Sequence, residues 1–163
     1  MLQTLKARLA QDRKHDEGFT LIELMVVVMI IAVLLAIAIP TFLGSQNKAK
    51  DKSAQSSLRN TVTAAKSIYV DGNDYSKADT TALGGAEPSL SFLAVAAAST
   101  KPKEVSINPG TSISTTFYAA AKSASGECYY IKDSTSGTLY SKGSGTCDGT
   151  TAATQTYTDT GWG

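Results

Sequence analysis

A single carboxylate, Glu23, interrupts an apolar run that extends from Gly18 to Pro40. A carboxylate at the middle of a bilayer costs on the order of 3 kcal/mol on insertion scales, so it needs a shallow position or a cationic partner. Glu23 lies only four residues after Phe19, where a helix dipole would favour it. A cut between Gly18 and Phe19 would alternatively create an α-amino group that could pair with Glu23 in the same chain or in a neighbour. The spacing therefore predicts either a plain membrane anchor with a tolerated acidic residue or a carboxylate that couples chain cleavage to assembly.

The segment that positions Glu23 has the length and composition of a membrane-spanning helix. From Phe19 to Ile39 the chain is apolar apart from Thr20 and Glu23. As a helix rising about 1.5 Å per residue, this stretch would be roughly 30 Å long, which matches the hydrocarbon core of a bilayer. A secretory signal peptide would have a shorter apolar region followed by a small-residue cleavage site, so ordinary signal-peptidase cleavage is disfavoured.

The charged residues that precede the span predict its orientation. Four basic residues lie before Gly18, and the acidic residues among them count little in the rule that sets membrane topology. We therefore expect a cytoplasmic amino terminus and the rest of the chain outside. The net charge of the whole chain is +1, which gives no basic surface of the kind that nucleic-acid binding needs. The basic residues are Lys6, Arg8, Arg13 and Lys14, and the acidic ones are Asp12, Asp16 and Glu17.

The run Gly18-Phe19-Thr20-Leu21-Ile22-Glu23, followed by the apolar segment, resembles the processing site of the type IV prepilin family. This family includes pilins and the pseudopilins of type II secretion and competence systems. The resemblance covers roughly residues 16–70. It implies that a membrane peptidase cuts after Gly18 and that the new terminal Phe19 is N-methylated. It also implies that Glu23 takes part in subunit docking, because an amino terminus that neutralises the carboxylate would fix a stagger that apolar contacts alone leave open.

The helix is predicted to kink or loosen at Pro40, which lacks a hydrogen-bond donor, and Gly44 adds backbone freedom there. This position is either the membrane exit or, as the resemblance suggests, a segment that extends during filament packing. Beyond it, apolar residues recur every three or four positions, which predicts an amphipathic helix up to the turn at residues 71–74. The apolar stripe consists of Ala54, Leu58, Val62, Ala65, Ile68 and Tyr69. Off the stripe lie Lys48, Lys50, Asp51, Lys52, Gln55, Arg59 and Lys66, a solvated or subunit-facing surface.

The rest of the chain predicts a small β-rich head. Residues 71–103 are interpreted as a connecting region, with a short helix over residues 87–98 opened by Pro88. Four strand-like segments follow after Pro102, separated by turn residues, and an antiparallel meander is the natural product. Packed on the helix, it would bury Ile113, Phe117, Ile131 and Leu139. The expected strands are residues 104–107, 112–120, 127–133 and 138–142.

Cys128 and Cys147 are the two cysteines of the chain. Outside the membrane an even pair favours a disulfide over two buried thiols, and so few soft ligands make a metal site improbable. A bond across this loop would contribute roughly 3 kcal/mol by chain-entropy arguments. A carboxy-terminal disulfide is found in many pilins and is absent from many pseudopilins, so the resemblance favours a pilin.

No catalytic constellation is evident in the sequence, so we expect neither an enzyme nor a cofactor or metal site. The single histidine, His15, lies in the leader that cleavage would remove. Residues 71, 73 and 74 carry oxygen ligands that calcium would accept, but their spacing differs from an EF-hand loop and a turn explains them. Trp162, near the carboxyl terminus, is interpreted as part of a flexible end rather than as an adhesive contact.

The predicted architecture is an α+β, pilin-like fold: a long amino-terminal helix, membrane-spanning in its first half, packed on a small antiparallel sheet with a carboxy-terminal disulfide. It comprises a leader (1–18), a membrane and filament-core helix (19–43), its amphipathic continuation (44–70) and an extracellular head (71–163). The resemblance implies a subunit of a type IV pilus, which supports adhesion, twitching motility, aggregation or DNA uptake. Alternatives are a pseudopilin or a plain membrane-anchored surface domain. The implied partners are the membrane, other pilin subunits, a prepilin peptidase that also methylates, an inner-membrane platform protein and an assembly ATPase, with no small-molecule substrate.

Overall fold

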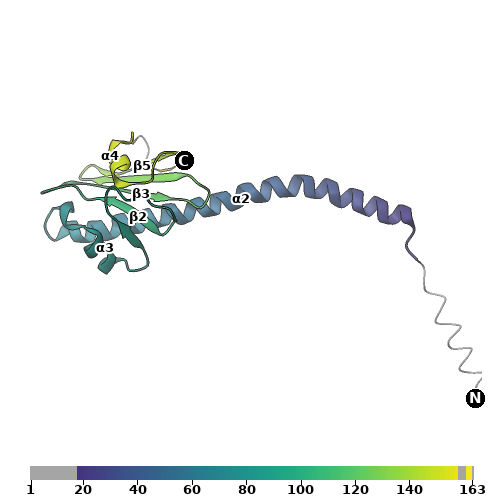
Figure 1. Cartoon of the computed structure of the whole chain (residues 1–163), viewed down its shortest axis with the longest axis horizontal. Coiled ribbons are helices and arrows are strands. Elements are labelled where there is room, and N and C mark those ends of the chain that lie inside the picture. The colour runs from purple at the N-terminus through teal and green to yellow at the C-terminus, as the bar shows by residue number, and fades with distance from the viewer. Residues whose placement is uncertain (1–17, 158–160, 163) are drawn as a thin grey trace, which may run out of the picture. The chain divides into compact units, whose positions relative to one another are not determined.

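The computed structural model describes residues 18–157, 161 and 162 (Figure 1). The chain divides into two units, an anchor unit that ends at Leu43 and a head unit that begins at Gly44. One helix, α2 (Leu21–Val70), contributes to both units. The leader and His15 lie outside the described residues, except for Gly18. The remaining elements all belong to the head unit: η2 (Tyr75–Lys77), α3 (Thr80–Ala86), β1 (Ser91–Leu93), β2 (Glu104–Asn108), β3 (Thr116–Lys122), β4 (Cys128–Ser134), β5 (Gly137–Gly143) and α4 (Gly149–Thr154).

Helix α2 ends where the sequence predicts. Its last residue is Val70, and the turn that follows includes Asn73 in the left-handed region, at φ 52°. The side chain of Asp74 then accepts a hydrogen bond from the Ser76 N–H and begins η2. Pro40 lies inside the helix, which is continuous through it, so a bend at that position stays a prediction.

The second part of α2 packs on the sheet through the predicted stripe. Ala54, Leu58 and Ala65 are fully buried, and Ile68 and Tyr69 pack at the edge of the same core. Gln55, which falls off the stripe, is also buried. Small polar residues are also buried on this helix, because each hydroxyl can donate to the carbonyl four residues earlier: Ser57 to Ser53, and Thr61 to Ser57.

The sheet of the described residues has five strands in the order β1-β2-β3-β4-β5. The predicted antiparallel meander is confirmed for β2 to β5, and β1 adds a parallel edge strand beside β2. The predicted helix over residues 87–98 is wrong. The helix in this region is α3, which Asp79 begins by accepting hydrogen bonds from the N–H groups of Thr81 and Ala82, and the chain then extends into β1.

The two faces of the sheet bury two different clusters, because successive side chains of a strand point to opposite faces. On β3, Ala119 and Ala121 join the core against α2, whereas Ala120 joins a second cluster with Cys128, Tyr130, Cys147 and Ala152. Figure 1 shows α2 and α4 on opposite sides of the strands. The sheet is therefore covered on both faces.

The predicted core residues are only partly correct. Phe117 and Ile131 are fully buried, and Leu139 is half-buried. Ile113 is 82% exposed, so its predicted burial is wrong. The expected strand begins four residues later than predicted, at Thr116, because the N–H of Ser114 donates to the Asp74 carboxylate and pulls the preceding segment into a loop.

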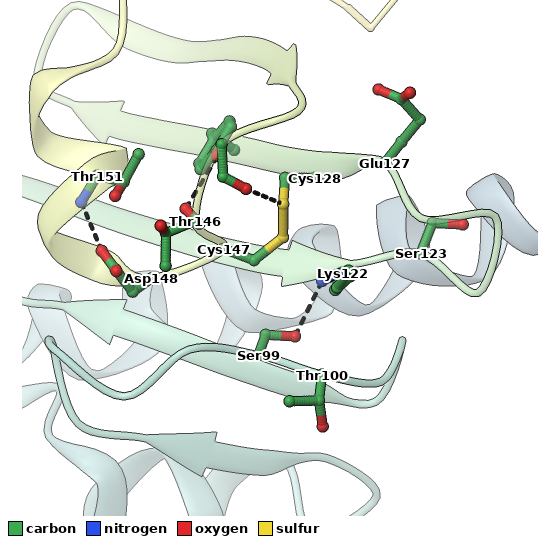
Figure 2. The surroundings of a disulfide bond; sticks show 12 residues. Ser99, Thr100, Lys122, Ser123, Glu127, Cys128, Thr146, Cys147, Asp148 and Thr151 are labelled. Carbon is green, nitrogen blue, oxygen red and sulfur yellow. Dashed lines mark hydrogen bonds between the residues drawn. A yellow bond between two sulfur atoms is a disulfide. The ribbon is translucent and has the colours of Figure 1, made fainter.

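The predicted disulfide between Cys128 and Cys147 is present and joins the start of β4 to the segment before α4 (Figure 2). Asp148 follows immediately, and its carboxylate accepts a hydrogen bond from the Thr151 N–H at the first turn of α4. The carbonyl of Cys147 also accepts from the N–H of Ser99. The disulfide therefore fixes the helix that covers the second face of the sheet.

Trp162 is buried, with 6% of its surface exposed, so its interpretation as part of a flexible end is wrong. Its indole N–H donates to the carbonyls of Tyr130 and Ser141, at 3.1 and 3.0 Å. Its ring meets Tyr140 edge-on, and the Arg59 guanidinium lies over it at 5.2 Å. The carboxy-terminal segment thus completes the core between α2 and the sheet.

Candidate processing and assembly site

Thr20 and Glu23 bond to each other at the first turn of α2. The N–H and hydroxyl of Thr20 donate to the Glu23 carboxylate at 2.9 and 2.7 Å, and the N–H of Glu23 donates back to the Thr20 hydroxyl oxygen at 3.3 Å. This reciprocal pattern is a capping box, in which each side chain satisfies a backbone N–H group that the helix leaves without a partner. The pair therefore starts the helix and holds the carboxylate against its amino-terminal end.

Glu23 consequently has hydrogen-bond partners in its own chain. The sequence-based hypothesis treated it as an unpaired carboxylate that waits for an amino group, and the structure corrects this point. Thr20 is the residue that the sequence reasoning missed. The signal was present, because threonine followed three residues later by glutamate before an apolar run is a helix-start signature.

The predicted scissile bond lies just outside the helix. Gly18, Phe19 and Thr20 precede α2 in non-helical backbone, and the Phe19 side chain is 81% exposed. A Cβ added to Gly18 would meet no heavy atom within 4 Å. Among the described residues, nothing packs against Gly18, so the backbone beside the predicted cut is accessible, as the backbone of a protease substrate must be. Cleavage there would leave the Thr20–Glu23 pair intact.

An apolar surface surrounds Glu23. Phe19, Ile22, Val26 and Val27 line a shallow depression of about 330 Å³ together with the carboxylate, because residues three and four apart share a helix face. Glu23 is the one acidic residue of this depression. A cationic group that docked there would meet a carboxylate framed by hydrocarbon, where an ion pair is weakly screened.

The whole apolar part of α2 is exposed. Its large side chains from Leu21 to Leu43 have exposed fractions between 49% and 86%. Among the described residues, α2 is the helix long and apolar enough to cross a membrane. A surface of this size requires either lipid or other apolar helices around it. Pro40 lies within this part, and Gly44 is the first residue of the head unit.

Comparison with known proteins places the amino-terminal segment in a defined class. The family model for the prokaryotic N-terminal methylation motif matches residues 13–39, which include Gly18, Phe19 and Glu23. The chain thus carries the amino-terminal segment shared by type IV pilins and related filament proteins. In this segment the chain is similar to type IV pilins, and its fold is α+β with a long amino-terminal helix.

Three curated relatives match part of the chain. The type IV major pilin protein PilA of Myxococcus xanthus is 44% identical over 69 residues, which are 42% of this chain and 31% of the relative. The type IV wide pilus major component PilA4 of Thermus thermophilus is 37% identical over 62 residues, 38% of this chain and 47% of the relative. The competence protein ComGC of Halalkalibacterium halodurans is 40% identical over 45 residues, 28% of this chain and 44% of the relative.

The similarity is confined to part of each protein. The chain spans between 31% and 47% of the length of these relatives. No solved structure matches the chain at a significant level.

Proposed function

We propose that this protein is the structural subunit of a type IV pilus, cut after Gly18, methylated at Phe19 and assembled through the apolar part of α2. The observation that carries the proposal is the Thr20–Glu23 pair at the start of the exposed apolar part of α2, next to an accessible Gly18–Phe19 bond. The similarity to two major pilins supports the same function. The assembled pilus would act in adhesion, motility, aggregation or DNA uptake.

The apolar surface of α2 would be covered first by lipid and later by other subunits. In the precursor, α2 spans the membrane, with the amino terminus on the cytoplasmic side as the basic leader predicts. In the filament, the same surface packs against the helices of other copies, so that apolar area remains covered throughout assembly. A prepilin peptidase that also methylates, a platform protein and an assembly ATPase would carry out this transfer.

Docking depends on a change of partner at Glu23. The N-methylated amine of Phe19 keeps its positive charge. The amine of an incoming subunit can reach the apolar depression around Glu23 of a subunit that is already in the filament. The carboxylate would then exchange hydrogen bonds from Thr20 for an ion pair with the incoming amine. Because this pair requires one axial position, it would select the stagger between subunits.

Two substitutions at Glu23 separate the charge from the helix cap. Glu23→Gln keeps an oxygen that can accept from Thr20, since glutamine also completes a capping box, but it carries no charge. Glu23→Ala removes both. If the charge sets docking, both variants should be processed normally and should reduce the yield of sheared filaments by about tenfold or more, the effect of losing about 1.4 kcal/mol.

The control is Thr20→Val, which retains the carboxylate and removes the hydroxyl of the cap. Filament yield near wild type for Glu23→Gln, with losses in Thr20→Val and Glu23→Ala, would refute a docking role for the charge and assign Glu23 to the helix cap. Processing is tested separately by Gly18→Val. If the cut occurs after Gly18, this bulkier residue should block it, and the chain should keep the mass of the precursor.

Intact-mass analysis of sheared and membrane fractions decides between a pilus and a pseudopilus. Abundant sheared protein that begins at N-methylated Phe19 would establish a pilus subunit. The same mature terminus in membranes alone would indicate a pseudopilin. The match to the competence protein ComGC is the observation that favours this alternative. An intact Met1 in both fractions would indicate a plain anchor.

A further inference from the structure

The head unit contains a basic pocket where the beginning of its helical part meets β4 and β5. The pocket has a volume of about 420 Å³. Three lysines contribute to its walls, two from α2 and one from β5, whereas it contains a single carboxylate. Its lining consists of Lys48, Asp51, Lys52, Gln55, Tyr129, Lys142 and Trp162.

Hydroxyl groups hold the carboxylate of the pocket. Asp51 accepts hydrogen bonds from the Ser123 and Ser125 hydroxyls at 2.7 and 2.5 Å. Burial alone would raise the pKa of Asp51, but hydrogen bonds from Ser125, Ser123 and Tyr129, together with the charge of Lys142, lower it overall, so this residue is ionised at neutral pH. Its negative charge is therefore stabilised by hydroxyl groups and, at longer range, by Lys142, and no described lysine forms an ion pair with it.

The lysine ammonium groups consequently keep their charge available. Among the described residues, neither Lys48 nor Lys142 forms an ion pair, and both are exposed. Lys52 donates to the side-chain oxygen of Gln55 at 3.1 Å, a neutral partner. With Asp51 subtracted, the pocket carries an excess of two positive charges (3 − 1 = 2). It is suited to an anionic group.

Two of the pocket lysines lie close in the sequence to the apolar segment that is proposed to span the membrane. Gly44 directly follows the apolar residues that end at Leu43. Lys48 and Lys52 lie about 6 and 12 Å beyond Gly44 along the helix, at about 1.5 Å per residue. The polar headgroup layer of a bilayer extends roughly 5 to 7 Å beyond its hydrocarbon core. A lysine side chain at these positions reaches that layer.

We propose that the basic pocket is a docking surface for anionic phospholipid headgroups, which holds the head unit on the bilayer while the precursor waits for assembly. The proposal depends on the membrane-anchored stage of the proposed function. Each lysine close to an anionic surface favours contact by roughly fivefold, from a contribution of about one kcal/mol. The membrane-spanning part of α2 holds the head unit near the bilayer. Lipid is therefore the first anionic partner that the head unit meets, because the attachment gives a high effective concentration of headgroups before any second subunit arrives.

The test uses the full chain, inserted into phosphatidylcholine vesicles with or without phosphatidylglycerol. Lysines are acetylated for short times and their modification is measured by mass spectrometry. We expect Lys48, Lys52 and Lys142 to react severalfold more slowly when phosphatidylglycerol is present. Lys77 and Lys103, which are exposed and do not line the pocket, should change little and correct for the general effect of surface charge.

A matched pair of variants tests the geometry of the pocket. Lys142→Gln removes a pocket charge contributed by β5, far from the membrane segment in sequence, and Lys103→Gln removes one charge elsewhere on the head unit. Lys142→Gln should reduce the phosphatidylglycerol-dependent protection of Lys48 by about fivefold, whereas Lys103→Gln should leave it unchanged. Equal effects of the two variants would overturn the pocket in favour of non-specific charge.

Two further results would also overturn the proposal. Equal protection in both kinds of vesicle would show that lipid charge is not recognised, and protection confined to assembled filaments would assign the pocket to a second copy of the chain. Vesicle flotation keeps these outcomes separate from failure of the proposed function. A chain that does not float with vesicles lacks the anchor itself, whereas a floating chain without lysine protection lacks only the docking surface.

Discussion

The ammonium of Lys66 lies 3.0 Å from the buried carboxylate of Asp133 and links the last part of α2 to β4. The same carboxylate accepts hydrogen bonds from the hydroxyls of Tyr75 and Thr138. Asp133 is 1% exposed, whereas the Lys66 side chain is 49% exposed. Four elements therefore meet at one carboxylate, and its two hydroxyl donors are less accessible to water than its lysine partner.

This difference in exposure predicts unequal effects of substitution. Asp133→Ala leaves the Tyr75 and Thr138 hydroxyls without their acceptor and should lower the free energy of unfolding by about 2–4 kcal/mol. Lys66→Gln should cost about 1 kcal/mol or less, because water can replace a half-exposed ammonium. Denaturant unfolding of the full chain in detergent measures both. A loss for Lys66→Gln as large as that for Asp133→Ala would show that the ion pair, and not the hydroxyl bonds, holds this junction.

Trp162 is predicted to stabilise the head unit through both its ring and its N–H group. Trp162→Ala should cost about 3–5 kcal/mol, as expected for removal of a buried aromatic residue. Trp162→Phe keeps an aromatic ring but removes the donor to the carbonyls of Tyr130 and Ser141, so its cost should be smaller. Thermal unfolding followed by circular dichroism compares the variants. An unchanged melting temperature for Trp162→Ala would contradict the buried position.

Reduction of the Cys128–Cys147 disulfide should destabilise the fold. The two residues are 19 positions apart, and a loop of this length contributes about 3 kcal/mol on the chain-entropy estimate. Because Cys147 precedes α4, the loss of the bond should expose that helix first. Hydrogen exchange with and without reductant should show faster exchange in residues 149–154, and alkylation of two thiols in the untreated native protein would refute the bond.

Asp74 is predicted to make stability depend on pH. Hydrogen bonds from the N–H of Ser114 and from the hydroxyl and N–H of Ser76 lower the pKa of its carboxyl. A pKa lowered by folding adds stability above the unfolded value of about 4, and this stability is lost as the pH falls through the lowered folded value. The difference in melting temperature between wild type and Asp74→Asn should therefore shrink below about pH 4.

Asp71→Asn is the matched control for this prediction. Asp71 is an exposed carboxylate at the same end of α2, so its substitution removes the same charge without removing the bonds to Ser76 and Ser114. If Asp74→Asn and Asp71→Asn change the melting temperature equally at every pH, the hydrogen bonds of Asp74 do not determine the acid response.

The parts of the fold that the sequence predicts are those with local signals. The recurrence of apolar residues along α2 and the turn residues between β2 and β5 are sufficient to assign those elements. The helix predicted over residues 87–98 had the right composition, yet it does not form. The carbonyls of Ala94 and Val95 instead accept bonds from Ser106 and Thr150, which are distant in the sequence.

The same division applies to the candidate functional residues. Gly18, Phe19 and Glu23 are recognisable because a short motif and an apolar run determine them. The bond between Asp74 and Ser114, which exposes Ile113, depends on residues 40 positions apart and has no local signal. The basic pocket is of this second kind, since only the folded sheet brings Lys142 to Lys48.

The Thr20–Glu23 capping box also bears on the reversibility of the filament. In the proposed docking step, a carboxylate with no partner of its own would gain the full strength of an ion pair and would release the incoming subunit more slowly. Glu23 already has two donors within its own chain, so docking gains only the difference between two sets of bonds. When a subunit leaves, Thr20 can satisfy the carboxylate again. If subunits dock by this exchange, as proposed above, a subunit can leave the filament and return to the membrane without leaving a bare charge in the bilayer.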